Sequence, residues 1–250
     1  MESNVDKLLK QTHLQADRLM CGILWALFAM GLALSGMHDT LRWALLVGLP
    51  AASLPTLAVM LRGGTRLSRL SVAVATMVFC ALHIHQAAGL AELHFGIFVL
   101  LAFLLCYRDW TVIVAAAATA ALHHLSFNYL QELGFGARCF TEPGFGKVLA
   151  HAAYVVAETA VLCYLARMLQ REALQSAELR VSVAAMANDG GVIDLRAGAL
   201  PASSASGRVL RGVVGLLENA MASVHESVRA TSATSGRIAA SNAELAEHTA

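Results

Sequence analysis

Histidine is the residue most able to bind a cofactor in this chain, and its positions are strongly biased. Seven of the ten histidines lie near one end of a series of apolar segments. Ionisable side chains inside a bilayer are costly and are usually retained for function. We therefore treat six of these seven, all except His38, as candidate ligands of a cofactor or a metal ion. The seven are His38, His83, His85, His94, His123, His124 and His151.

Helix geometry limits how these side chains can share one ligand. Residues two apart on a helix point about 200° away from each other and neighbours about 100°. His83 and His85 therefore face different ways, as do His123 and His124. One or two heme b groups, each held by imidazoles from two helices, fit this pattern better than one compact tetrahedral site. Copper or zinc bound by His85, His124, His151 and His94 is the alternative.

Residues around the histidines add to both alternatives. The stretch 115–121 is a run of small residues against which a porphyrin could lie. His124 is followed at helical spacing by Asn128 and Gln131, and His151 by Tyr154 and Glu158. We expect Asn128, Tyr154 and Glu158 to support the ligands from behind. Soft and borderline donors that suit copper occur at Met37, His38, Met77, Cys80 and His83.

The composition places these residues in a membrane protein. Of 250 residues, 57% are hydrophobic and 14% are charged, and the mean hydropathy is +0.61. Six apolar segments are long enough, or nearly long enough, to cross a bilayer, which takes about 20 residues. The net charge of +1 gives no indication of a nucleic-acid partner, so membrane lipid is the expected surrounding. The predicted spans are 19–35, 41–61, 68–90, 94–107, 111–130 and 147–169.

The basic residues predict the orientation of these spans. Seven arginines at span ends fall on the side of the two termini: 18, 62, 66, 69, 108, 167 and 171. The opposite side has only Arg42, Arg138 and Lys147. The positive-inside rule therefore predicts that both termini are cytoplasmic and that the histidines lie in the outer leaflet. The outer loop 131–146 is either a lid over the histidines or a plain connector. The five cysteines indicate no disulfide framework.

The remaining third of the chain has a different pattern. From position 210, residues at spacings of four and three form a heptad seam that begins Leu210, Val214, Leu217 and Met221. Such a seam is typical of a coiled coil, which needs a partner helix, so we expect a homodimer. The pattern is still running at Ala250, which is expected of a truncated chain. The predicted regions are a cytoplasmic lead-in 1–18, a six-span sensor domain 19–169, a signalling linker 170–206 and a coiled coil 207–250.

The coiled-coil region carries a family resemblance. Residues 207–250 resemble the start of the cytoplasmic coiled coil of methyl-accepting chemotaxis proteins, and 186–198 is similar to the glycine- and aspartate-containing piece before it. The resemblance covers about a quarter of the chain and includes no complete HAMP relay, no methylation windows and no hairpin tip. It implies a bacterial inner-membrane chemoreceptor that acts on chemotaxis signalling proteins through a further C-terminal part.

Together these observations predict an all-α membrane protein: a six-transmembrane-helix bundle followed by a cytoplasmic linker and a dimeric coiled coil. We expect a signal receptor, not an enzyme, that binds heme b, or alternatively copper or zinc, and relays its state to the coiled coil. A transporter would favour internal repeats and a midplane site, and neither is evident. An electron-transfer cytochrome would need histidines in both leaflets.

Overall fold

The computed structural model describes residues 4–186, 195 and 204–249. These residues form helices and turns, and no strand occurs among them. The contacts between residues divide the chain into two units, Met1–Ala173 and Leu174–Ala250. The helices of the first unit are α1 (Asn4–Leu34), α2 (Leu41–Trp43), η1 (Ala44–Gly48), α3 (Leu49–Arg62), α4 (Arg66–Gln86), η2 (Ala91–His94), α5 (Phe95–Phe103), η3 (Leu104–Tyr107), α6 (Trp110–Glu132) and the first part of α7 (Phe145–Met186).

Five of these segments are long and apolar enough to cross a membrane. They are Asn4–Leu34, Leu41–Arg62, Arg66–Gln86, Trp110–Glu132 and Phe145–Met186. The predicted span 94–107 corresponds to the shorter apolar segment Ala91–Tyr107, which begins three residues earlier than predicted and contains 3-10 turns at both ends. The all-helical fold is thus confirmed, and its long apolar helices are compatible with a membrane protein, while the six spans and the dimeric coiled coil stay predictions.

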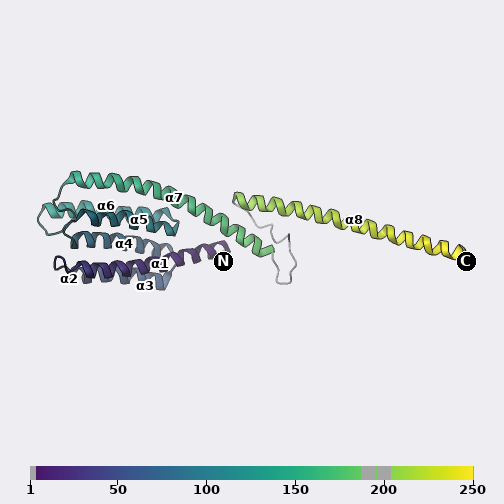
Figure 1. The fold of residues 1–250 in the computed structure, drawn as a ribbon, viewed down its shortest axis with the longest axis horizontal. Coiled ribbons are helices and arrows are strands. Elements are labelled where there is room, and N and C mark those ends of the chain that lie inside the picture. Colours follow the sequence, from purple (N-terminus) through teal and green to yellow (C-terminus); the bar gives the residue numbers. More distant parts are fainter. Residues whose placement is uncertain (1–3, 187–194, 196–203, 250) are drawn as a thin grey trace. The chain divides into compact units, whose positions relative to one another are not determined.

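Helix α4 lies at the centre of the bundle, beside α1, α3 and α6 (Figure 1). More than half of its apolar window is buried, a larger share than in any other described span. Its fully buried side chains include Val72, Phe79 and Ile84. The surrounding helices instead keep many large apolar side chains on the outside. This arrangement is expected in a bilayer, where the outer face needs no polar cover.

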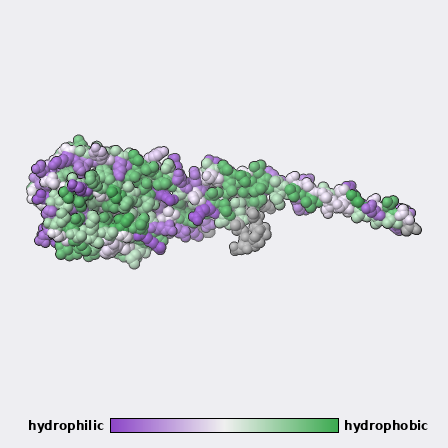
Figure 2. Space-filling view, in the orientation of Figure 1, coloured by the Kyte–Doolittle hydropathy of each residue, from purple (hydrophilic) through white to green (hydrophobic). Residues whose placement is uncertain are grey.

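The surface of the first unit agrees with that environment. Figure 2 shows apolar residues over the length of the bundle, with hydrophilic residues gathered toward its ends. Leu46, Leu54 and Met60 on the segment Leu41–Arg62 and Leu122 on α6 are each more than 60% exposed. A soluble protein rarely leaves so much contiguous apolar surface open to water. A membrane location is therefore plausible for this unit.

A buried polar network centred on Asp17 connects the helices of the bundle on the N-terminal side of the apolar part of α1. The carboxylate of Asp17 is fully buried and accepts hydrogen bonds from the Tyr107 hydroxyl (2.9 Å), the Ser68 hydroxyl (2.8 Å) and the Gly64 amide (2.7 Å). Beside it, Arg69 of α4 donates to Asp109 at 2.9 Å. These contacts join α1, α4, η3 and the start of α6 and fix the bundle's geometry.

Replacing Asp17 with alanine is expected to destabilise this end of the bundle. The change leaves the Tyr107 hydroxyl and the Gly64 amide without their acceptor, at a cost of about 1–3 kcal/mol for each stranded donor. Thermal unfolding of the purified protein in detergent should show a clearly lower midpoint. The matched control is Glu142→Ala, which removes an exposed carboxylate and should leave the midpoint unchanged. Equal midpoints for the two variants would contradict a stabilising role for Asp17.

The second unit consists of the end of α7 and the long helix α8 (Ala205–Thr249). Helix α7 runs without a break from Phe145 to Met186 and so passes through the boundary between the units. On α8, the heptad residues Leu217, Met221, Val224, Val228, Ile238 and Leu245 are all at least 50% exposed. Most of the segment 186–198 lies outside the described residues.

Candidate metal centre

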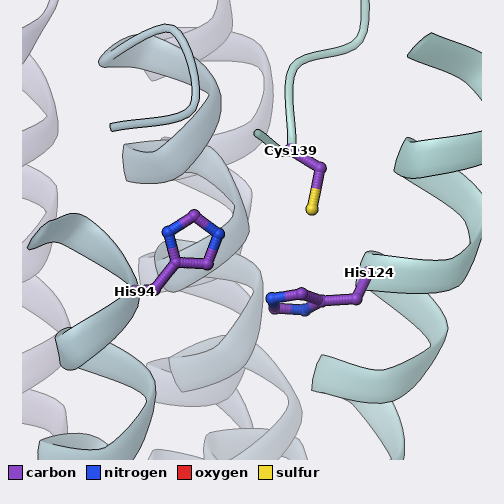
Figure 3. Close-up of side chains that lie close together, drawn as sticks. All are labelled: His94, His124 and Cys139. Carbon is purple, nitrogen blue, oxygen red and sulfur yellow. The ribbon is translucent and has the colours of Figure 1, made fainter. Parts of the chain in front are cut away.

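Three potential metal ligands meet at the end of the bundle where α6 ends and α7 begins. His94 is the last residue of η2, His124 lies two turns before the end of α6, and Cys139 lies in the connection between α6 and α7. One ligand atom from each residue lies within 4.8 Å of the other two. Figure 3 shows the three side chains pointing toward a common space from three different segments. All three are at most 5% exposed.

The hydrogen bonds of the two imidazoles prepare them for metal binding. In His94, Nδ1 donates to the carbonyl of Leu90 at 3.2 Å, and in His124 it donates to the carbonyl of Ala120 at 2.9 Å. Since a carbonyl can only accept, the proton must be on Nδ1, and Nε2 carries the lone pair. Both Nε2 atoms are buried and have no hydrogen-bond partner. A metal-bound histidine usually has this arrangement, in which the ring nitrogen that does not bind the metal donates its proton to a backbone carbonyl.

Aromatic rings close the space around these ligands. The Phe140 ring stacks on His94, with centroids 5.4 Å apart and planes 4° apart. The ring of His151, from the start of α7, lies 5.1 Å from His94 and 5.7 Å from His124, measured between centroids. Its Nδ1 donates to the carbonyl of Lys147, so His151 holds the same tautomer as the other two. His151 lies outside the group of atoms within 4.8 Å.

Gln131 holds the cysteine-bearing connection in place. Its side-chain carbonyl accepts from the amides of Cys139 (2.9 Å) and Phe140 (3.2 Å), and its amide donates to the Phe140 carbonyl at 2.7 Å. From the other side, Gly89 approaches the Phe140 backbone so closely that an added Cβ would lie 2.3 Å from its carbonyl carbon. The connection, residues 133–144, is therefore held beside the histidines and is called the lid below.

Replacing Gln131 with alanine is expected to weaken metal binding although Gln131 is no ligand. The variant frees the Cys139 backbone while both imidazoles keep their carbonyl partners. Loss of such a supporting partner typically costs about 10–100-fold in metal affinity, which competition with a chromophoric chelator would measure. Gln131→Glu is the matched control because it keeps the acceptor for both amides, and it should retain more affinity than Gln131→Ala. Unchanged affinity in both variants would contradict the role of Gln131 in holding Cys139 in place.

The structure separates the other predicted ligands from this group. The Nε2 of His83 bonds to the Leu27 carbonyl at 3.0 Å, which occupies it within the α1–α4 contact. His85 accepts from the Arg138 amide through Nδ1 at 3.2 Å and so supports the lid. His123 faces Cys139 from the other side, with 3.9 Å between Nε2 and Sγ. His85 and His123 thus contact the segment that carries Cys139, whereas His83 belongs to the α1–α4 contact.

The predicted supporting residues and copper donors are dispersed as well. Asn128 supports the lid, since its side-chain carbonyl accepts from the Gly144 amide at 2.8 Å. Tyr154 is 72% exposed. Glu158 has one buried carboxylate oxygen without a partner. Met77 and Cys80 are buried core residues of α4, and His38 bonds through Nδ1 to the Gln86 carbonyl at 2.9 Å.

Cys139 was not among the ligands predicted from the sequence. It lies in the connection between α6 and α7, and its place beside His94 depends on Gln131 and Gly89, which contact the backbone of Cys139 and Phe140. Burial raises the pKa of the Cys139 thiol to about 12. A bound cation would reverse this effect, because a coordinating thiol is deprotonated outright.

Two imidazoles and one thiol form a donor set for a transition-metal ion. Tetrahedral and trigonal sites have nitrogen and sulfur ligands about 3–4 Å apart, given metal–ligand bonds of about 2.0–2.3 Å. The ligand atoms here need only a small inward movement to reach that spacing. A porphyrin between the same imidazoles would have to displace Phe140 from its stack on His94.

Comparisons with known proteins identify no relative: no protein-family model, no curated protein and no solved structure matches the chain.

Proposed function

We propose that this chain is a membrane-embedded receptor that binds one transition-metal ion, copper or zinc, through His94, His124 and Cys139. The observation that carries the proposal is the pair of buried Nε2 atoms that have no partner and lie beside a buried thiol. Leaving buried polar atoms unpaired costs free energy unless something fills the space between them. A metal ion satisfies both nitrogens and the sulfur at once.

The donor set supports an ion over heme b. A bis-histidine heme needs a flat slot between two imidazoles, whereas the space between His94 and His124 is bordered by Cys139 and by the stacked Phe140 ring. The sulfur is also a ligand that a bis-histidine heme does not use. Heme b stays the second candidate, and the visible spectrum distinguishes the two.

The proposed signal passes through α7. The lid joins α6 to α7, so an ion that draws Cys139 inward acts on the segment from which α7 begins. Helix α7 then continues unbroken to Met186, beyond the apolar part. The open heptad stripe on α8 supports a coiled-coil homodimer as the output. In this proposal the receptor lies in the bacterial inner membrane with both termini in the cytoplasm, and it acts on chemotaxis signalling proteins.

Elemental analysis and a visible spectrum of the purified protein test the binding step. One copper or zinc per chain without a Soret band is the expected result. A Soret band with sharp reduced bands would select heme b instead, and a protein with neither ligand would refute the proposal. The relay is tested separately with Val224→Cys on the α8 seam. Its rate of disulfide crosslinking should change when metal is added, and an unchanged rate would contradict the relay.

Metal affinity is expected to rise with pH. Because burial raises the pKa of Cys139 to about 12, the thiol is protonated at neutral pH, and binding as thiolate must release its proton. The apparent affinity should therefore increase about tenfold per pH unit between about pH 7 and pH 9. Titrations at several pH values, with a chelator whose own pH dependence is known, measure the slope. A flat profile would mean that the thiol does not bind the metal.

A further inference from the structure

We propose that the ion at this site is monovalent copper, Cu(I), held by three ligands: the Nε2 atoms of His94 and His124 and the Sγ atom of Cys139. The inference rests on the metal site proposed above and names the ion that the site selects. It follows from the charge, the chemical softness and the number of the ligands.

The charge of the ligand set matches a monovalent ion. Both imidazoles keep a proton on Nδ1, where it is bonded to a backbone carbonyl, so each is a neutral ligand. The thiolate supplies one negative charge, and among the described residues no aspartate or glutamate joins the group. Cu(I) therefore gives a neutral centre, whereas Zn(II) leaves one positive charge uncompensated. The site is buried and lined by aromatic rings, so a net positive charge there would be removed from water at a high cost in free energy.

The softness and number of the ligands point the same way. A thiolate is a soft ligand that favours Cu(I), and imidazole binds copper well. Zinc sites almost always have four ligands, but among the described residues only three ligand atoms lie within 4.8 Å of one another. Two further imidazoles border the group without meeting that limit: His151, which is half-buried, and His123, whose Nε2 lies 3.9 Å from Sγ of Cys139. A three-ligand site satisfies Cu(I) without recruiting another residue.

The binding step is balanced by loss of one proton. The Sγ–H bond of Cys139 breaks as the Sγ–Cu(I) bond forms, and the proton is released to the buffer. The two imidazoles bind through lone pairs and lose no proton. No electron is transferred, because the ion enters already reduced. One proton should therefore be released for each ion bound.

Competition titrations of the full chain in detergent, carried out without oxygen, test the inference. Cu(I) is titrated against bicinchoninate and Zn(II) against a zinc-sensitive dye. We expect one Cu(I) per chain that excess Zn(II) does not displace. Cys139→Ser should lower the Cu(I) affinity by more than about 100-fold, since loss of a mere supporting partner already costs about 10–100-fold. Cys139→Asp, which keeps the negative charge on a hard oxygen, should lower the affinity for Cu(I) more than the affinity for Zn(II).

The outcomes separate this inference from the proposed function. One Zn(II) per chain that Cu(I) does not displace would overturn the choice of ion and leave the metal site standing. Cu(I) affinity that is equal in the wild type and in Cys139→Ser would also overturn it. Failure of both ions to bind would refute the metal site itself. His225→Gln, on the exposed surface of α8, controls for binding by histidines elsewhere.

Discussion

His124→Ala is expected to abolish stoichiometric metal binding. His124 supplies one of only three ligand atoms within 4.8 Å of each other, and no other described residue belongs to that group. Removal of one ligand leaves two donors, too few to compete with a chelator, so the affinity should fall by far more than the roughly 10–100-fold cost of losing a supporting residue. The measurement is metal content per chain after gel filtration in the presence of a weak chelator.

The control for this variant is His225→Ala, which removes an exposed histidine from α8. It should retain one metal ion per chain. His124→Ala leaves a buried cavity, which is expected to lower stability slightly even without metal. Thermal unfolding of both variants in the absence of metal shows whether His124→Ala is still folded. A folded His124→Ala variant that still holds one ion would remove this residue from the site.

Gly89→Ala is expected to displace the lid and with it the thiol. Gly89 has a φ of +83°, and a Cβ there would lie 2.3 Å from the Phe140 carbonyl carbon and 2.5 Å from its oxygen. Backbone atoms cannot yield as a flexible side chain would, so Phe140 and the adjacent Cys139 must move. Metal affinity should fall by more than the roughly 10–100-fold that loss of a supporting partner costs, because a ligand itself is displaced. Chelator competition measures the fall, and the reactivity of Cys139 toward a thiol reagent should rise.

Gly134→Ala is a close control for this effect. Gly134 also has a positive φ, +78°, but nothing lies within 4 Å of the added Cβ. Both variants therefore carry the same kind of backbone strain, and only Gly89→Ala adds a collision. Metal binding should survive in Gly134→Ala. Similar losses in the two variants would assign the effect to strain and contradict the close packing of the lid.

The helical fold could be predicted well from the sequence because apolar segments of membrane length leave few alternatives. Five segments match helices that could cross a membrane. The segment Ala91–Tyr107 was harder to predict, because its ends form 3-10 turns set by contacts with neighbouring helices. The heptad pattern on α8 predicts a partner helix, and a single chain cannot test that prediction.

The candidate site could be predicted only in part. The bias of the histidines predicted a site at one end of the bundle, where the candidate group lies. Helix geometry predicted that His83 and His85 point in different directions, and they bond to different segments. Which imidazoles face each other depends on how α6, η2 and the lid pack. Cys139 could not be selected from the sequence, because its position results from contacts that Gln131 and Gly89 make with the backbone of Cys139 and Phe140.

X-ray absorption spectroscopy of the metal-loaded protein tests the central claim most directly. The claim is that His94, His124 and Cys139 close on one ion. It predicts a first shell with imidazole nitrogens and one sulfur, and a first shell without sulfur in Cys139→Ser. A wild-type spectrum with nitrogen or oxygen neighbours alone, or with the four in-plane nitrogens of a porphyrin, would contradict it.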